Sequence, residues 1–281
     1  HPWVDSTEGA AVRISMTVCE QGRQEGVLFQ VIAETPTGND ETEVLLSQLR
    51  GYIQSDLTIG PNVSGTRALL SNTLVCCPGV KINGTGFIIT YDQAVKFGLG
   101  RTTSLGSYIK KYISGRDLNQ VPRGHLVIDL YGLSEQEVRS QFPEIYQWVL
   151  ERVKPERDQN RDQRVRDEWW IHGRPRPELR NALAGTSQYV ATVETSKHRI
   201  FVLLDSNTLP DNTVVSIALS DTYFLGVLSS HVHTTWALAT GGRLEDRPRY
   251  QKALCFDPFP FPDPTDTQRA DIRALAEQLD A

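Results

Sequence analysis

Residues 188–219, in the second half of the chain, read QYVATVETSKHRIFVLLDSNTLPDNTVVSIAL. Apolar and β-branched side chains gather in three short runs of this stretch, at residues 188–194, 199–204 and 213–219. Runs of this length that are separated by Ser, Asn, Asp and Pro residues are typical of β-strands joined by turns. The stretch therefore predicts three strands of one short sheet.

Helical patterns lie on both sides of the predicted strands. Ser134 and Glu137 have the spacing of a capping box, in which each side chain binds a backbone N–H at the start of a helix. A second helix is expected after Pro143, and Asp221 is expected to cap a long helix that ends near Ala239. The expected fold class is therefore mixed α/β (α+β), with a short mixed or antiparallel sheet packed by helices.

The N-terminal part of the chain has a different pattern. Residues 10–18 alternate apolar and polar side chains and residues 27–32 are strand-like, so the two segments are predicted to pair as a β-hairpin. A linker is expected at residues 35–42, which contain Pro and Gly, and a helix is expected at residues 43–54. At the other end, an amphipathic run from Thr267 predicts a terminal helix.

The composition excludes some classes of protein. The chain has 281 residues, of which 39% are hydrophobic and 22% are charged, and this is an ordinary globular profile. The formal net charge of -5 argues against a polybasic protein that coats nucleic acid, but it leaves open a DNA reader with a local basic face. Because no apolar run approaches the roughly 20 residues of a membrane span, we expect no membrane partner.

The cysteines and histidines lack the spacing of a metal site. Cys76 and Cys77 are adjacent and no CxxC is present, so the thiols are expected to be reduced, as in a cytoplasm. His231 and His233 are two residues apart, which puts them on different faces of a helix. We expect no metal ion, and His233 is more simply explained as a core residue than as a ligand.

Arginines are concentrated between residues 152 and 180. Acidic residues interleave with them, so one interpretation is a solvated helix face. The other is a surface that contacts DNA phosphates, with Trp169 and Trp170 as packed or stacking support. On this second interpretation, the candidates for DNA backbone contacts are Arg157, Arg161, Arg164, Arg174 and Arg176, together with Lys197 and Arg199.

A short charged loop follows Gly241-Gly242, where the predicted long helix ends. Glu245 and Arg247 are two residues apart, so they can point the same way on an extended segment. Arginine donates two hydrogen bonds to the major-groove edge of guanine, and glutamate accepts one from the amino group of cytosine. The two residues can therefore span a G·C base pair, or they can form a surface ion pair of little energetic consequence.

Motifs for catalysis are missing from this sequence. Gly98-Leu99-Gly100 lacks the third glycine of a dinucleotide-binding loop. The segment from Asp257 to Pro260 lacks the adjacent prolines of an amino-methyltransferase loop, and no Gly-x-Ser-x-Gly elbow is present. No catalytic residue and no cofactor is therefore expected within the chain itself.

Blocks of sequence from one end of the chain to the other share a family resemblance. They are residues 2–16, 113–118, 122–124, 127–129, 151–157, 169–170, 176–180, 197–199, 210–212, 225–230, 256 and 259–262, with His233 and Trp236. In order and coverage they resemble the target-recognition region of MmeI-like (Type IIL/IIG) restriction–modification enzymes. These enzymes are large bacterial adenine-specific DNA methyltransferases, and the region follows their catalytic domain.

The resemblance implies a function and a site. In this family adenine N6 of a short duplex site is methylated with S-adenosylmethionine, and the donor-binding and catalytic motifs are expected upstream of His1. The expected partners are double-stranded DNA and an upstream methyltransferase domain of the same chain, in the bacterial cytoplasm. Two residues of the loop after Gly242-Arg243 read one base pair in the family, which assigns base reading to Glu245 and Arg247.

The resemblance also implies three segments. Residues 1–35 are expected to be a β-hairpin remnant of the methyltransferase domain, residues 36–264 the DNA target-recognition domain, and residues 265–281 the start of a C-terminal spacer helix. Two alternatives from other classes stay open: a protein–protein scaffold or regulatory module of the parent enzyme, and a stand-alone hydrolase. Duplex affinity that falls steeply with salt would favour DNA reading over the scaffold.

Overall fold

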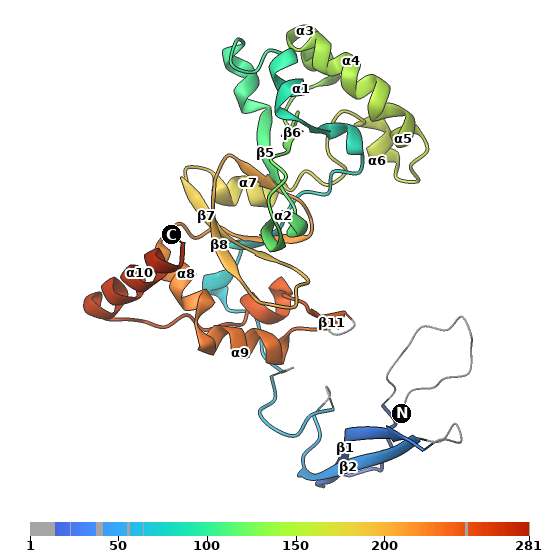
Figure 1. Cartoon of the computed structure of the whole chain (residues 1–281), viewed down its shortest axis with the longest axis vertical. Coiled ribbons are helices and arrows are strands. Elements are labelled where there is room, and N and C mark those ends of the chain that lie inside the picture. Colours follow the sequence, from blue (N-terminus) through green and yellow to red (C-terminus); the bar gives the residue numbers. More distant parts are fainter. Residues whose placement is uncertain are drawn as a thin grey trace. The chain divides into compact units, whose positions relative to one another are not determined.

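The three strands expected within residues 188–219 are confirmed in the computed structural model, which describes residues 15–22, 24–37, 42–54, 57–63, 65–244 and 247–280. They are β7 (Gln188–Val193), β8 (Phe201–Asp205) and β10 (Val214–Ile217). A short strand from earlier in the chain, β3 (Cys76–Pro78), joins them in the order β3-β10-β7-β8. Two of these strands, β7 and β8, are labelled in Figure 1. All three pairings are antiparallel.

A second sheet is linked to the first by one strand that the sequence pattern did not reveal. It has the order β4-β6-β5-β9, from β4 (Ile88–Ile89), β6 (Leu126–Ile128), β5 (Ile109–Ile113) and β9 (Thr208–Pro210). β9 pairs with β5 in parallel, so the chain leaves the first sheet after β8 and returns to it as β10. The turn between β9 and β10 is thereby held at the junction of the two sheets.

Helices pack against both sheets and complete two separate cores. The core of the second sheet contains Phe87, Val127 and Val149, and the core of the first contains Val190, Leu228 and Phe256. This arrangement confirms the expected mixed α+β class. The helices are α1 (Tyr91–Lys96), α2 (Gly115–Asn119), α3 (Glu135–Gln141), α4 (Pro143–Arg152), α5 (Lys154–Asp158), α6 (Gln163–Asp167), α7 (Pro177–Leu183), α8 (Thr222–Ser229), α9 (His231–Thr240) and α10 (Asp266–Asp280).

Local signals located several helix starts correctly. The Ser134 hydroxyl accepts from the Glu137 N–H at 3.3 Å, and the Glu137 carboxylate accepts from the Ser134 N–H at 2.7 Å, as a capping box requires. The single long helix expected from Asp221 to about Ala239 is wrong, because it is two helices that meet at Ser230. Ser230 adopts extended backbone angles and its hydroxyl caps α9, so a new helix begins there.

The chain divides into two compact units, residues 1–64 and 65–281. In the first unit, β1 (Gly26–Pro36) pairs antiparallel with β2 (Thr42–Gly51). The helix predicted at residues 43–54 is therefore wrong, because cross-strand pairing with β1 outweighs a weak helical spacing. The hairpin partner predicted at residues 10–18 lies outside the described residues up to residue 14, and residues 15–18 form no strand.

Two of the expected segment boundaries fall inside paired or packed structure. The boundary at residues 35/36 lies within the hairpin, since β1 and β2 pair on either side of it. The terminal helix α10 is present, and it packs on α8 in the second unit. Arg273 donates to the Asp221 carboxylate at 2.8 and 2.6 Å, and a Cβ at Gly226 would lie only 2.7 Å from Ile272 Cγ2.

The described residues contain neither a candidate membrane span nor a candidate metal cluster. None of their helices has the length and apolar composition to cross a membrane. Over the same part of the chain, no group of three or more His, Cys, Asp or Glu side chains lies close enough together to hold a metal ion.

The proline-rich segment after α9 is held by one buried amide. Pro258 and Pro260 have no N–H to donate, so this segment cannot join a regular hydrogen-bond ladder and its carbonyl groups need other donors. Asn72 supplies them: its Nδ2 lies 3.2, 3.1 and 2.9 Å from the carbonyl oxygens of residues 256, 257 and 259. Asn72 thus connects the start of the second unit to its C-terminal wrap.

We expect Asn72→Ala to lower the free energy of unfolding by about 1–3 kcal/mol, because it leaves the buried carbonyl of Phe259 without its donor. The carbonyl groups of residues 256 and 257 keep a second donor, from the N–H groups of Phe259 and Leu69. Thr73→Ala, an exposed neighbour, should change it by less than about 0.5 kcal/mol. Chemical denaturation of both variants measures the two values. Equal effects of the two substitutions would show that the amide does not hold the wrap.

Candidate nucleic-acid interface

The predicted reading loop folds as a two-stranded hairpin. β11 (Arg243–Leu244) pairs antiparallel with β12 (Arg247–Pro248). Arg247 is exposed on β12, whereas Glu245 lies outside the described residues. One of the two predicted base-reading residues is therefore found on an exposed strand of a short hairpin.

The two ends of the hairpin are closed on each other. A Cβ at Gly241 would collide with the carbonyl oxygens of Ala237 and Arg249, so only glycine fits where the chain leaves α9. The next residue, Gly242, donates its N–H to Gln251 Oε1 at 2.9 Å and accepts from the Arg249 N–H at 2.8 Å. These bonds close the base of the hairpin.

The hairpin is also attached to the end of β7. The Tyr250 N–H donates to the Glu194 carbonyl at 2.6 Å, and the Ser196 N–H donates to the Pro248 carbonyl at 3.2 Å. The Arg249 guanidinium forms an ion pair with the Glu194 carboxylate. The hairpin is thus a separate two-stranded sheet that is bonded to the residues at the end of β7.

Arg199, a predicted contact for the DNA backbone, is engaged inside the protein. Its guanidinium donates to Thr192 Oγ1 at 3.1 Å, to the Val193 carbonyl, and to the Pro248 carbonyl at 3.2 Å. It lies 5.2 Å from the centre of the Tyr250 ring, and burial lowers the pKa of Arg199. The prediction is corrected here, because these acceptors occupy the donors that a phosphate would need.

Arg157 requires the same correction, since its side chain is only 1% exposed. Its Nη2 donates to the carbonyl groups of Ile82 and Ile171 at 2.7 and 3.0 Å, and the guanidinium lies 5.5 Å from the centre of the Phe87 ring. Burial lowers the pKa of Arg157 to about 10. A side chain held in the core in this way cannot reach DNA.

Two of the other predicted arginines meet at a surface cavity beside the base of the hairpin. Arg174 is exposed there, and its main chain pairs with Lys81 through bonds of 3.0 and 3.1 Å. Arg176 donates to the Gly79 carbonyl at 3.3 Å and lies 3.3 Å from the Glu178 carboxylate. The cavity has a volume of about 450 Å³ and is lined by Pro78, Lys81, Arg174, Arg176, Glu194, Asn212, Val215, Tyr250, Gln251, Lys252 and Ala253.

The cavity contains two basic residues that sequence reasoning missed. Lys252 follows the predicted loop closely, so its proximity to that loop was an available signal. It forms an ion pair of 2.5 Å with Asp257. Lys81 is far from the other basic residues in sequence and is brought to them by its bridge to Arg174, so no local signal could have found it.

The remaining predicted contacts lie elsewhere on the surface. Arg161 and Lys197 are exposed, the latter in the loop between β7 and β8. Arg164 pairs with Glu168 at 3.1 Å, one helical turn away on a solvated face, which agrees with the simpler interpretation of the arginine-rich stretch. The two tryptophans belong to the core: Trp169 is 4% exposed, and Trp170 Nε1 donates to the Leu133 carbonyl at 2.9 Å.

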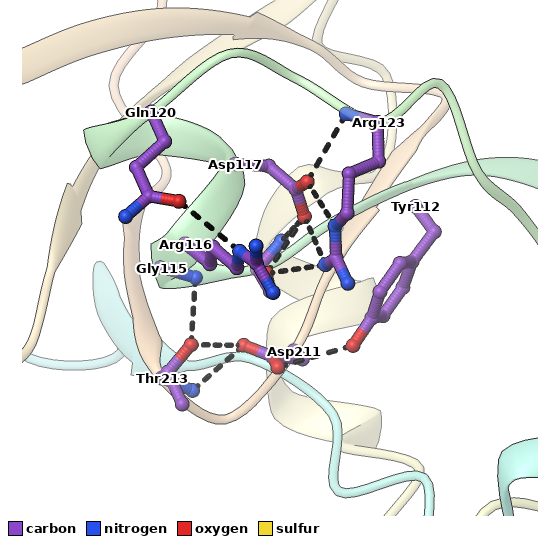
Figure 2. A network of polar contacts seen from close by, with 9 residues as sticks. Tyr112, Gly115, Arg116, Asp117, Gln120, Arg123, Asp211 and Thr213 are labelled. Atoms are coloured by element: carbon purple, nitrogen blue, oxygen red, sulfur yellow. Dashed lines mark hydrogen bonds and ion pairs between the residues drawn. The ribbon is translucent and has the colours of Figure 1, made fainter.

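The turn between β9 and β10, which reaches the cavity through Asn212, is supported by a polar network (Figure 2). Tyr112 donates to the Asp211 carboxylate at 3.1 Å, and Thr213 Oγ1 accepts from the Gly115 N–H at 2.7 Å. On the same helix, Asp117 accepts from the Arg123 guanidinium at 2.7 and 2.8 Å. These bonds hold the pKa of Asp117 well below its usual range, so the network stays charged.

Behind the hairpin lies a buried histidine. His233 Nε2 is 2.9 Å from the Tyr250 hydroxyl, and the ring packs edge-on against Phe259 with centroids 4.2 Å apart. Burial, and then the charge of Arg199, lower the pKa of His233 to about 4. His233 is therefore a core residue, as expected, and it supports the tyrosine on which Arg199 lies.

Comparison with known families identifies the chain as a target recognition domain. A sequence model of the family "MmeI, target recognition domain" matches residues 63–263. The chain therefore belongs to the MmeI target recognition domain family, which confirms the resemblance inferred from its sequence blocks. The match begins close to residue 65, where the second compact unit starts.

Two known proteins resemble the chain and are much longer. The solved structure of the Type IIL restriction–modification enzyme MmeI in complex with DNA has a TM-score of 0.70 and 19% identity, and the match covers 98% of this chain and 36% of that one. At this identity the likeness concerns the fold. DNA methyltransferase A of Bacillus subtilis (strain 168) is 34% identical over 89 residues, which are 30% of this chain and 10% of that protein.

We expect the stability of the chain to fall as pH decreases from 6.5 to about 4. In this window the unfolded chain takes up a proton on His233 that the folded chain does not, so the folded state loses stability. Burial also lowers the pKa of His172, which acts in the same direction.

In His233→Gln the slope of unfolding free energy against pH should be shallower by at most about 1.4 kcal/mol per pH unit, the value for one proton. Thr73→Ala, an exposed substitution that removes no titratable group, should keep the wild-type slope. Denaturant titrations across the window measure both. A slope in His233→Gln that equals that of the wild type would contradict the neutral, buried histidine.

Proposed function

We propose that the chain is the DNA sequence recognition module of a larger S-adenosylmethionine-dependent adenine-N6 DNA methyltransferase of a restriction–modification system. The observation that supports this most is an exposed hairpin with Arg247 beside a basic cavity, in a member of the MmeI target recognition domain family. The proposed setting is the bacterial cytoplasm. The sequence has no donor-binding motif, so S-adenosylmethionine is assigned to the methyltransferase domain of the parent enzyme.

The chemistry of each side chain suggests which part of the DNA it would contact. Arg247 would donate to the major-groove edge of guanine, and Glu245 would accept from the amino group of the paired cytosine. Lys81 and Arg174 would contact phosphates from the cavity, and Lys197 would contact them from the loop beside the hairpin. The target adenine would then be extruded into the catalytic pocket of the parent enzyme.

The positive charge of the cavity favours DNA over a protein partner. The net charge of the whole chain is -5, yet the cavity contains four basic side chains and one carboxylate, Glu194, which is paired with Arg249. Two of the four, Arg176 and Lys252, are paired with Glu178 and Asp257, so the local positive charge comes from Lys81 and Arg174. A local positive surface of this kind suits a polyanion. A scaffold or regulatory module would have no need of it.

Exchanging the charges of the two reading residues should change the DNA site. In the full-length parent enzyme, Glu245→Lys with Arg247→Asp places a donor where the acceptor was and an acceptor where the donor was. We expect the methylated site to change at one base pair and to stay the same at all others. Mapping the methylated positions in DNA exposed to the enzyme measures this.

The control is the same kind of exchange at an exposed ion pair of α5, Lys154→Asp with Asp158→Lys, which should leave the site unchanged. If the reading-residue exchange also left the site unchanged, the readout assigned to the hairpin would be wrong.

Removing a cation from the cavity should weaken binding without changing specificity. For Arg174→Ala in the full-length parent, we expect the plot of log affinity against log salt concentration to become shallower by about 0.9, since one phosphate contact is lost. The loss of affinity should be equal for cognate and non-cognate duplexes.

Arg139→Ala, an exposed arginine of α3 outside the cavity lining, is the matched control and should keep the wild-type slope. Fluorescence anisotropy with labelled duplexes at several salt concentrations gives both slopes. Duplex affinity without any salt dependence would instead support a role other than DNA reading.

A further inference from the structure

Arg199 connects two segments that are far apart in sequence. Nη1 donates toward β7, to Thr192 Oγ1 and the Val193 carbonyl. Nη2 donates to the hairpin, at the Pro248 carbonyl 3.2 Å away, and also to the Glu194 carbonyl at 3.5 Å, where β7 ends. The planar guanidinium thus bonds to both segments, and the side chain clamps β12 to the end of β7.

The acceptor on the hairpin is directly next to a reading position. Pro248 follows Arg247 in β12, and its carbonyl accepts both from Arg199 and from the Ser196 N–H at 3.2 Å. Two donors on one carbonyl fix the orientation of that peptide group. Proline also restricts its own backbone torsion, so little freedom is left in the chain on the C-terminal side of Arg247.

The Arg199 guanidinium also packs against the core. Tyr250 lies under Arg199 with its ring centre 5.2 Å away, and the Tyr250 hydroxyl is 2.9 Å from His233 Nε2. Tyr250 is 1% exposed and His233 is fully buried. The clamp therefore rests on side chains that cannot move without disturbing α9.

We infer that Arg199 is a positioning residue for base readout: it sets the path of β12 so that Arg247 is presented to one base pair. This inference rests on the proposed function of the hairpin. It replaces the direct phosphate contact that the sequence suggested for Arg199.

Substitution of Arg199 by lysine distinguishes a phosphate contact from the clamp on β12. A phosphate contact needs a positive charge, which lysine keeps. The clamp needs a planar fork with donors at both ends, which the single ammonium group of lysine cannot provide. Arg199→Lys therefore keeps the charge for a phosphate contact but removes the clamp, and Arg199→Met removes both.

The test uses the full-length parent enzyme and three measurements: methylation rates on duplexes that vary one base pair at a time, the salt dependence of duplex affinity, and the melting temperature. For Arg199→Lys we expect discrimination to fall on the order of tenfold at the base pair assigned by the charge exchange at residues 245 and 247, with discrimination at other positions retained. The slope against salt should stay close to that of the wild type.

Lys197→Met, an exposed cation on the same loop, is the contrasting variant. Its slope against salt should become shallower by about 0.9 while its discrimination is retained. Arg199→Met should lose discrimination as Arg199→Lys does, with no change in slope.

Two results would overturn the inference. Wild-type discrimination in Arg199→Lys, with a shallower slope in Arg199→Met, would identify a phosphate contact. A loss of discrimination at every position, together with a lower melting temperature, would identify a general structural role. In both cases the proposed function stands if the exchange at residues 245 and 247 still changes the methylated site, so the two failures are distinguishable.

Discussion

The candidate interface depends on the main chain of Glu194, where β7 ends. Its N–H donates to the Thr213 carbonyl at 2.8 Å, and its carbonyl accepts from the Tyr250 N–H at 2.6 Å. One residue therefore holds the turn after β9 on one side and the reading hairpin on the other. Because backbone hydrogen bonds are directional, both loops inherit their positions from a buried strand. The sheet, and not the loops themselves, therefore fixes the positions of the residues at the candidate interface.

The basic residues have two different roles, and burial separates them. Arg157 and Arg199 are surrounded by carbonyl and hydroxyl oxygens, and both keep their charge because a guanidinium stays protonated at neutral pH even when burial lowers its pKa. Lys81 and Arg174 are exposed at the cavity. On the proposed function only the second kind would contact DNA, and their gathering at one cavity lets a chain of net charge -5 present a local basic surface.

Sequence patterns predicted the elements whose cause is local. The strands in residues 188–219 and the capping box at Ser134 follow from side chains a few residues apart. The helix expected at residues 43–54 failed because its conformation is decided by pairing with β1. The site also combines local and long-range causes. Arg174 and Arg176 could be predicted because they lie in an arginine-rich stretch, whereas Lys81 is brought beside Arg174 only by a long-range bridge. Whether an arginine is buried depends on the whole fold, so Arg157 and Arg199 could not be assigned from their neighbours.

The hairpin separates the residues that would read DNA from those that hold the fold. Arg243, Leu244 and Arg247 are exposed, and substitutions at such positions change stability by about 0.5 kcal/mol or less. Behind them, Gly241 has no room for a Cβ and Tyr250 is fully packed, so changes there disturb the core. A domain built in this way can exchange its reading side chains while its sheet, clamp and cavity stay the same. On the proposed function, the constraint on specificity is then the path of β12, because a new side chain at position 247 acts from the position that β7 and Arg199 provide.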